Sequence, residues 1–227
     1  MIDVTELTLS YQVRSGIFAS DKIKALDGLS FSVFEGETLG IIGRNGSGKS
    51  TLLRVLAGIY PPDDGKIISR AKSVSLMTLM LGFDPVLSGR DNALFGGMLL
   101  GFSKSQVYDQ IEAIKHFSGL DQNFEKAVGS YSSGMVSRLS FSIAINLSPD
   151  VMLVDEVLAV GDEAFRGKAY TAMSDKISSN QTTIFVSHSA LEIERLCDRV
   201  LLLEQGRLVA EGEPAAIIKE YRALLSF

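Results

Sequence analysis

The sequence predicts an α/β protein with a parallel-sheet core, an antiparallel β subdomain at the start and an α-helical subdomain inserted near the middle. The first third contains segments rich in β-forming residues and separated by Gly, Pro and Asp, which indicates an antiparallel sheet. These segments are VTELTLSY, GLSFSVFEGE and GKIISRAKSVSL. Further on, VMLVDE and TTIFVSH are short apolar runs separated by a helical stretch, as in a parallel sheet.

A helical pattern occupies the middle of the chain, from about residue 90 to 147. Within it, Val107, Ile111, Ile114 and Phe117 recur on one face, and a second helix follows Gly134. No repeat, low-complexity tract or linker separates independent units. We therefore expect one domain over residues 1–227, with the helical subdomain inserted at about 85–147.

Composition and charge narrow the classes of function. The chain has 227 residues, of which 46% are hydrophobic and 22% charged, as in an ordinary packed globular protein. Its net charge of −5 provides no basic excess to neutralise phosphates, so we expect no nucleic-acid partner. The single cysteine, Cys197, excludes an internal disulfide and fits a reducing compartment.

Membrane insertion is not expected. The opening MIDVTELTLS alternates polar and apolar residues, unlike a signal peptide. The longest apolar stretches, 75–83 and 94–102, are about half the ~20 residues that a membrane span requires. We interpret these stretches as parts of the hydrophobic core, and the second interpretation is a surface patch that binds a membrane partner.

A glycine-rich loop between a strand and a helix is the clearest chemical feature. TLGIIGRNGSGKST places an apolar strand before Gly43-x4-Gly48-Lys49-Ser50 and the helical STLLRVLAG after it. Backbone amides of such a loop turn toward phosphates, and the helix N-terminus adds partial positive charge. We therefore predict a P-loop NTPase (RecA-like) core, with Lys49 on the β and γ phosphates of ATP and Ser50 on Mg²⁺. The expected ATP-binding residues here are Gly43, Arg44, Asn45, Gly46, Ser47, Gly48, Lys49, Ser50 and Thr51.

Acidic residues and a histidine follow two later strands. Asp155 and Glu156 end VMLVDE, where carboxylates are costly unless they are used. Beside a P-loop, Asp155 would hold Mg²⁺ and Glu156 would polarise the attacking water. His188 follows TTIFV at the edge where open α/β folds bind ligands. It either contacts the γ phosphate and the water or is a hydrogen-bonded structural residue.

The stretch YSSGMVSRL, residues 131–139, is a turn that runs into a helix. Ser132 or Ser133 would cap the first turn of that helix. Together with the P-loop, VMLVDE and the strand-end histidine, in this order, the chain resembles the ATP-binding cassette (ABC) ATPase family over essentially its whole length.

The resemblance gives the serine-glycine turn a role. In that family the turn is the signature motif, Leu-Ser-Gly-Gly-Gln, which closes on ATP held by the P-loop of a second subunit. Tyr131 takes the Leu position, Ser132, Ser133 and Gly134 the next three, and Met135 the Gln position. The resemblance thus implies a second copy of the chain as partner. DEVLAVGD aligns with the family pattern Asp-Glu-Pro-Thr-Ser-Ala-Leu-Asp, which makes Asp162 the subunit-bridging aspartate.

Three segments resemble one branch, the ATPases of polysaccharide exporters. They are YSSGM, DEVLAVGDEAF and GFDPVLSGRDN. This branch implies a peripheral subunit on the cytoplasmic face of the inner membrane, bound to an integral membrane permease in two copies, that drives lipid-linked polysaccharide across. Since the chain ends soon after EGEP, we expect no C-terminal carbohydrate-binding domain. The alternatives are another cargo (drug, lipid or teichoic acid), a soluble ABC ATPase without transport, and a small-molecule kinase.

One position departs from the family pattern, and the role of another has two interpretations. The family glutamine between the P-loop and the helical insertion has no counterpart, because no glutamine lies between Gln12 and Gln106 and the segment SLMTLMLGFDP offers only Thr78. Coupling through that loop would then be less polar. Tyr11, at the end of the first expected strand, either stacks on adenine or is an exposed tyrosine, and Phe18 competes for the stacking role.

Overall fold

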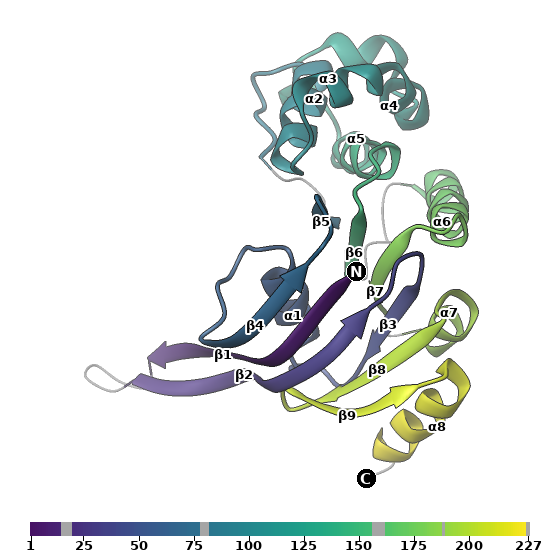
Figure 1. Cartoon of the computed structure of the whole chain (residues 1–227). Helices are drawn as coiled ribbons and strands as arrows, with labels where there is room; N and C mark the ends of the chain where they lie inside the picture. The colour runs from purple at the N-terminus through teal and green to yellow at the C-terminus, as the bar shows by residue number, and fades with distance from the viewer. Residues whose placement is uncertain (15–19, 78–81, 156–161, 188, 226–227) are drawn as a thin grey trace.

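The computed structural model describes residues 1–14, 20–77, 82–155, 162–187 and 189–225. A six-stranded sheet carries a second, three-stranded sheet on one face and helices on the other, and a lobe of helices extends from one end (Figure 1).

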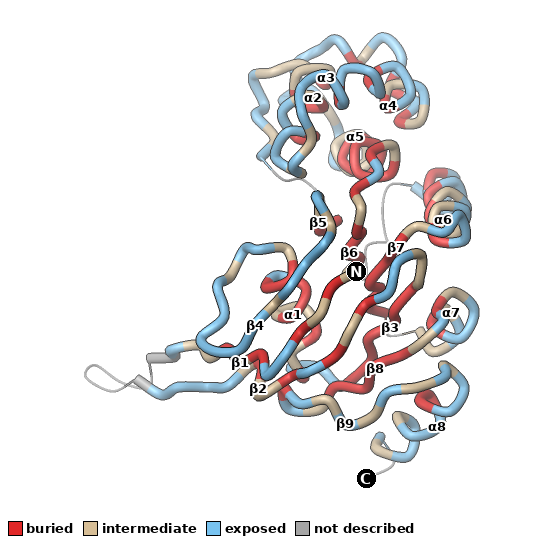
Figure 2. Tube along the Cα trace, viewed as in Figure 1, coloured by how far each residue is buried: buried red, intermediate tan, exposed pale blue. Residues whose placement is uncertain are grey.

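The larger sheet is parallel except at one edge, with the order β5-β6-β7-β3-β8-β9. Its strands are β5 (Val74–Met77), β6 (Val151–Asp155), β7 (Thr182–Val186), β3 (Thr38–Ile42), β8 (Arg199–Glu204) and β9 (Arg207–Gly212). Only β9 is antiparallel to its neighbour β8. Every residue of β3 and β7 is buried, as expected for central strands covered on both faces (Figure 2).

Two apolar cores cover the two faces of this sheet. One fills the space between the two sheets and includes Leu52 and Leu53 of α1 (Lys49–Leu56). The other lies beneath α6 (Glu163–Ser178), α7 (Ala190–Leu196) and α8 (Pro214–Leu225). The sheet is thus fixed from both sides, which sets the positions of the loops at its carboxyl edge.

The three-stranded sheet has the order β2-β1-β4 and is antiparallel. It is formed by β1 (Ile2–Arg14), β2 (Ser20–Val33) and β4 (Asp64–Ser69). Strands β1 and β2 remain paired as far as Arg14 and Ser20. The placement of Tyr11 at a strand end is therefore wrong, because Tyr11 lies within β1 opposite Ile23.

The segment GKIISRAKSVSL divides between the two sheets, so its assignment to the antiparallel sheet alone is wrong. Its first part forms β4, which pairs with β1. Its last part forms most of β5, which pairs with β6 in parallel, Val74 opposite Val151. Ser75, Leu76 and Met77 are all buried, and such a run suits a strand covered on both faces.

The helical lobe has an apolar core of its own, which includes Val107, Ile111 and Ile114. Its helices are α2 (Gly89–Leu99), α3 (Lys104–Asp109), α4 (Ile111–Ser118) and α5 (Ser133–Asn146), with 3-10 turns at Asp121–Glu125 and Val128–Ser130. The sequence predicts one helix face from Val107 to Phe117, but these residues belong to two helices, because α3 ends before Gln110 and α4 begins after it. Phe117 packs outside the core of the lobe, against the core that lies beneath α6, α7 and α8.

Candidate functional site

The glycine-rich loop joins the carboxyl end of β3 to the start of α1. Gly43, Gly46 and Gly48 have φ values of 156°, 79° and 105°, a region that L side chains rarely adopt. Gly48 is the N-cap of α1, and no side chain caps this helix. The first-turn amides are therefore available to an anion, and the helix dipole favours one there.

Backbone from two other segments closes around this loop. A Cβ on Gly48 would lie 2.5 Å from the carbonyl oxygen of Ala25, in β2. The amide of Gly206, in the turn between β8 and β9, donates to the Ser47 carbonyl at 3.0 Å. Gly206 in turn accepts from the Asp27 amide at 2.8 Å. The loop is thus held between the two sheets, with no room for a side chain at Gly48.

Lys49 supplies a buried cation within the loop. Its side chain donates to the carbonyl oxygens of Gly43 and Arg44 at 2.8 and 2.9 Å, and only 7% of the residue is exposed. A lysine held this way presents positive charge at the helix N-terminus, in a chain whose net charge is negative. A phosphate bound at this loop would meet that local charge.

A cavity of about 340 Å³ opens in front of the loop. Its walls are Tyr11, Ile23, Lys24, Ala25, Asn45, Gly46, Ser47, Gly48, Lys49, Ser50, Thr51, Asp155 and Val186. The structure thus brings Tyr11, most of the loop and Asp155 to one cavity. Gly43 and Arg44 are not among these walls. Arg44 borders a second hollow of about 320 Å³, with Asn45, Glu204 and Gln205.

Tyr11 is held in place from two sides. Its hydroxyl lies 3.2 Å from the Thr51 hydroxyl on α1. Its ring meets Tyr60 edge to face, with centroids 6.0 Å apart and planes at 82°. The competing Phe18 lies outside the described residues. A half-buried aromatic ring therefore forms one wall of the cavity.

Sequence reasoning missed the part of the wall that β2 supplies. Ile23 lines the cavity because it pairs with Tyr11 across the hairpin. Lys24 lines it too, and it forms an ion pair with Asp27 at 2.9 Å. Hydrogen bonds from Lys24 and Arg207 lower the pKa of Asp27. The alternation of Ile23 and Ala25 in DKIKAL was the available signal, but the register that places them beside the loop is not local.

Asp155 ends β6 opposite Val186, the last residue of β7. Its carboxylate therefore reaches the cavity from the sheet edge, beside the start of α1. Glu156 and His188, the expected catalytic residues, lie outside the described residues. Ser187, which precedes His188 in the sequence, is buried; its hydroxyl donates to Glu192 at 2.7 Å and accepts from the Ser189 amide at 3.0 Å.

The serine-glycine turn lies in the helical lobe and does not line the cavity. Ser132 caps α5, accepting from the Met135 amide at 3.2 Å. Ser132 and Ser133 are exposed. The preceding Tyr131 anchors the turn, since its hydroxyl donates to the Asn123 carbonyl at 2.6 Å. Asp162 caps α6 in a similar way, accepting from the Phe165 amide at 2.9 Å.

In the ranges that the structure describes, no helix combines the length and apolar character that crossing a membrane requires.

Comparison with known proteins gives consistent matches. A family model described as ABC transporter matches residues 26–159. The chain is 43% identical over 202 residues to the ABC transporter protein AbcA of Aeromonas salmonicida, an alignment that covers 89% of this chain and 66% of that protein. It is 38% identical over 205 residues to the O-antigen export system ATP-binding protein RfbB of Klebsiella pneumoniae, covering 90% and 83%.

Another relative is the teichoic acids export ATP-binding protein TagH of Enterococcus faecalis, 41% identical over 201 residues. That alignment covers 88% of this chain and 45% of the relative, so the chain spans less than two thirds of some relatives that it matches. Among solved structures, a dimeric ATP-binding cassette in a post-hydrolysis state bound to ADP and Pi superposes with a TM-score of 0.74. At 19% identity, with 94% of this chain and 99% of that chain covered, it confirms the predicted fold class.

The packing around the loop predicts unequal costs for two glycine substitutions. Gly46→Ala and Gly48→Ala both force alanine into positive φ, which costs about 1 kcal/mol. Only at Gly48 would the new Cβ meet a backbone oxygen, since Gly46 has nothing within 4 Å. Gly48→Ala should therefore lower the free energy of unfolding by about 2 kcal/mol more than Gly46→Ala does. Urea unfolding measures both, and equal losses would contradict the packing argument.

Proposed function

Because this chain belongs to the ABC transporter family, we propose that it is an ATP-hydrolysing subunit that drives the export of lipid-linked polysaccharide. The observation that carries the proposal is the cavity in which a phosphate-binding loop, a strand-end aspartate and an aromatic wall meet. The relatives named for O-antigen and teichoic acid export support the cargo class.

The residues around the cavity suit ATP with Mg²⁺. The uncapped helix start and Lys49 would hold the β and γ phosphates. The Ser50 hydroxyl and the Asp155 carboxylate are oxygen ligands of the kind that Mg²⁺ prefers, and both line the same cavity. Mg²⁺, when bound, would neutralise charge that develops on the phosphates. Tyr11 would stack on the base, which adds about 1 kcal/mol.

Glu156 and His188 complete the proposed catalytic set. Glu156 directly follows Asp155 in the sequence, and it would polarise the attacking water. His188 follows Ser187, which is buried and bonded to Glu192. It would contact the γ phosphate and that water.

Two copies of the chain would form each working site. The serine-glycine turn leads into the start of α5, just as the P-loop leads into the start of α1. Its residues Ser132, Ser133 and Gly134 do not line the cavity of their own chain. We propose that this turn closes on ATP held by the second copy, with the helix N-terminus facing the γ phosphate. Asp162 would bridge the two copies near the same interface.

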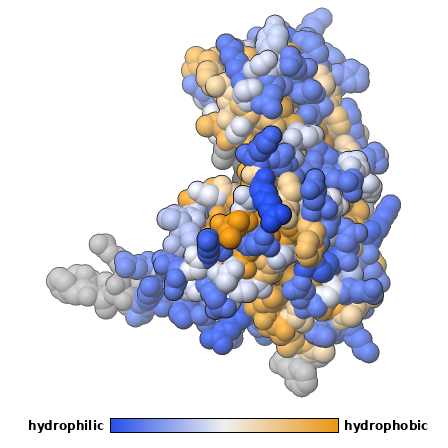
Figure 3. All heavy atoms as spheres, viewed as in Figure 1, coloured by the Kyte–Doolittle hydropathy of each residue, from blue (hydrophilic) through white to orange (hydrophobic). Residues whose placement is uncertain are grey.

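An apolar groove supports an integral membrane partner. It lies between the sheets and the helical lobe and has a volume of about 280 Å³. Its walls are Ala57, Ile59, Val74, Ser75, Leu76, Leu99 and Leu100. Ile59 and Leu99 are 53% and 58% exposed, and hydrophobic side chains border the hollow between the two lobes in Figure 3. We propose that a permease subunit covers this groove, two copies for two ATPase chains, which places the protein at the cytoplasmic face of the inner membrane.

Coupling to the permease would use apolar rather than amide contacts. Val74, Ser75 and Leu76 of the groove come shortly before Thr78 in the sequence, and that part of the chain has no glutamine. Thr78 itself lies outside the described residues. The acidic net charge disfavours the alternative of a soluble ABC ATPase acting on nucleic acid or ribosomes. A kinase would leave the serine-glycine turn without a role.

ATP turnover by the purified chain tests the enzymatic proposal. Lys49→Ala should lower turnover by about a hundredfold or more, because it removes the cation that meets the phosphates. Lys66→Ala, at an exposed lysine of β4, should retain the rate. Glu156→Gln should keep nucleotide affinity and accumulate as a dimer with ATP. Wild-type turnover by Glu156→Gln would contradict the catalytic assignment.

Depletion of the protein in its own cells tests the cargo. A glycan exporter predicts that lipid-linked polysaccharide accumulates on the cytoplasmic face of the inner membrane and disappears from the surface. Labelling of surface glycan and extraction of lipid-linked intermediates measure the two pools. Unchanged surface glycan would contradict the polysaccharide cargo and favour a drug, lipid or other export substrate.

A further inference from the structure

Helix α6 holds the helical lobe through two lysines. Lys168 donates to the Phe117 carbonyl, in the last turn of α4, at 2.8 Å. Lys176 donates to the carbonyls of Ile145 and Leu147, at the C-terminus of α5, at 2.5 Å each. The last carbonyls of a helix have no amide partner within it, and the dipole there favours a cation. We call Lys168 and Lys176 the two-lysine clamp.

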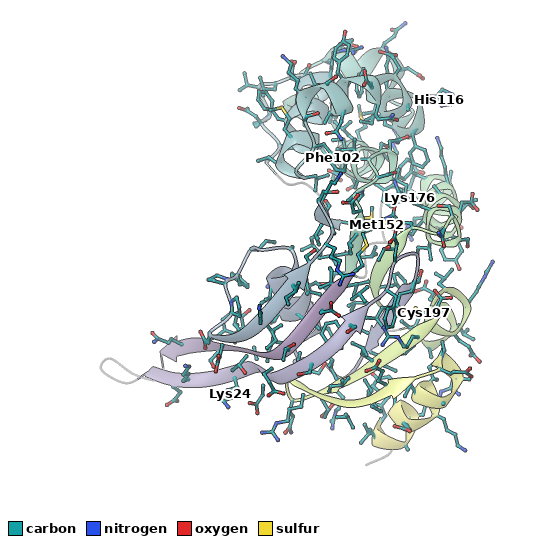
Figure 4. All side chains as sticks on the ribbon, in the orientation of Figure 1. Lys24, Phe102, His116, Met152, Lys176 and Cys197 are labelled. Carbon is teal, nitrogen blue, oxygen red and sulfur yellow. The ribbon has the colours of Figure 1, made fainter. Side chains whose placement is uncertain are left out.

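Lys176 is the stronger half of the clamp, because it is half-buried and bonds two carbonyls, while Lys168 is exposed and bonds one. In Figure 4 it lies on the side of α6 nearest to α5. Burial lowers its pKa to about 8, which leaves the amine mostly cationic at pH 7. Two carbonyl acceptors compensate this buried charge. Removal of the amine would leave both carbonyls without this partner.

Aromatic packing fixes the same interface. Phe165, in the first turn of α6, meets Phe117 and Phe141 edge to face, with centroids 5.8 and 6.0 Å apart. Lys168 also lies 4.2 Å from the Phe117 ring centroid. Beyond the end of α6, Gln181 donates to the Pro149 carbonyl, in the connection from α5 to β6, at 2.9 Å. The end of α5 is therefore held on one body with α6.

We propose that Lys176 is a positioning residue that sets the serine-glycine turn relative to Asp162 and the ATP site of the second copy. Both functional segments are N-terminal caps, Ser132 on α5 and Asp162 on α6. Lys176 joins the same two helices at their C-terminal ends. This inference rests on the proposed ATPase function. It adds a residue remote from the nucleotide that acts through the orientation of α5.

Helix geometry gives the size of the effect. Helix α5 has 14 residues, so it is about 21 Å long at ~1.5 Å per residue. A tilt of about 5° around its clamped end would move its first residues by about 2 Å. Misplacement by about 1 Å can cost about a hundredfold in rate. A small loss of restraint at Lys176 would therefore reduce turnover while the P-loop, on a different element, keeps its nucleotide.

Steady-state ATP turnover of the full chain tests this role. Lys176→Met should lower kcat by about tenfold and leave KM within about twofold of wild type. Lys176→Arg keeps a cation that can reach the same carbonyls, and it should recover most of kcat. Lys168→Met should lower kcat less, because that lysine is exposed. Lys219→Met, the same change at an exposed lysine of α8, should have no effect.

The outcomes separate this inference from the proposed function. Folded Lys176→Met with wild-type kcat would overturn the positioning role. The positioning role would also be overturned if Lys176→Met and Lys176→Arg both lose kcat, nucleotide affinity and melting temperature to the same extent, since that result indicates general destabilisation. If Lys176→Met does not fold, Lys176→Gln decides, because its side chain is shorter and uncharged, and wild-type kcat in that variant overturns the inference. Absence of turnover in the wild-type chain overturns the proposed function itself.

Discussion

The close contact of three backbone segments determines the site. Gly48 of the phosphate loop and Gly206 of the β8–β9 turn both lie against the Ala25 carbonyl of β2, where a Cβ would come within 2.8 Å. These contacts, together with the hydrogen bonds from Asp27 to Gly206 and from Gly206 to Ser47, join the antiparallel sheet to the parallel one. The cavity proposed for the nucleotide exists because one sheet provides the loop and the other provides the aromatic wall.

A second constraint is that the proposed functional segments lie in two different lobes. The P-loop and Asp155 lie at the carboxyl edge of the parallel sheet, and the serine-glycine turn lies at the start of α5 in the helical lobe. The helical lobe has a core of its own, and α5 also contributes Phe141 to the core beneath α6. Function would then depend on the relative orientation of the lobes, which the contacts of α6 with α4 and α5 restrain.

Local signals in the sequence were sufficient to predict the strand, loop and helix at residues 38–56, because the apolar run, the glycines and the lysine follow one another directly in the chain. They were insufficient wherever a partner is distant in sequence. Nothing in VSLM tells which sheet it joins, and nothing near Tyr11 tells that Ile23 lies opposite. The hydrogen bond of Tyr131 to Asn123 and the clamp by Lys176 likewise depend on tertiary packing.

Mixing two inactive variants tests whether two copies of the chain share each ATP site. Lys49→Ala damages the P-loop, and Gly134→Asp damages the serine-glycine turn, so a mixed dimer retains one intact site. If the sites are shared, each variant alone is inactive and an equal mixture recovers up to about a quarter of wild-type turnover, because half of the dimers are mixed and each mixed dimer has one intact site of two. Failure of the mixture to recover any turnover, or full activity of Gly134→Asp alone, would contradict the shared site.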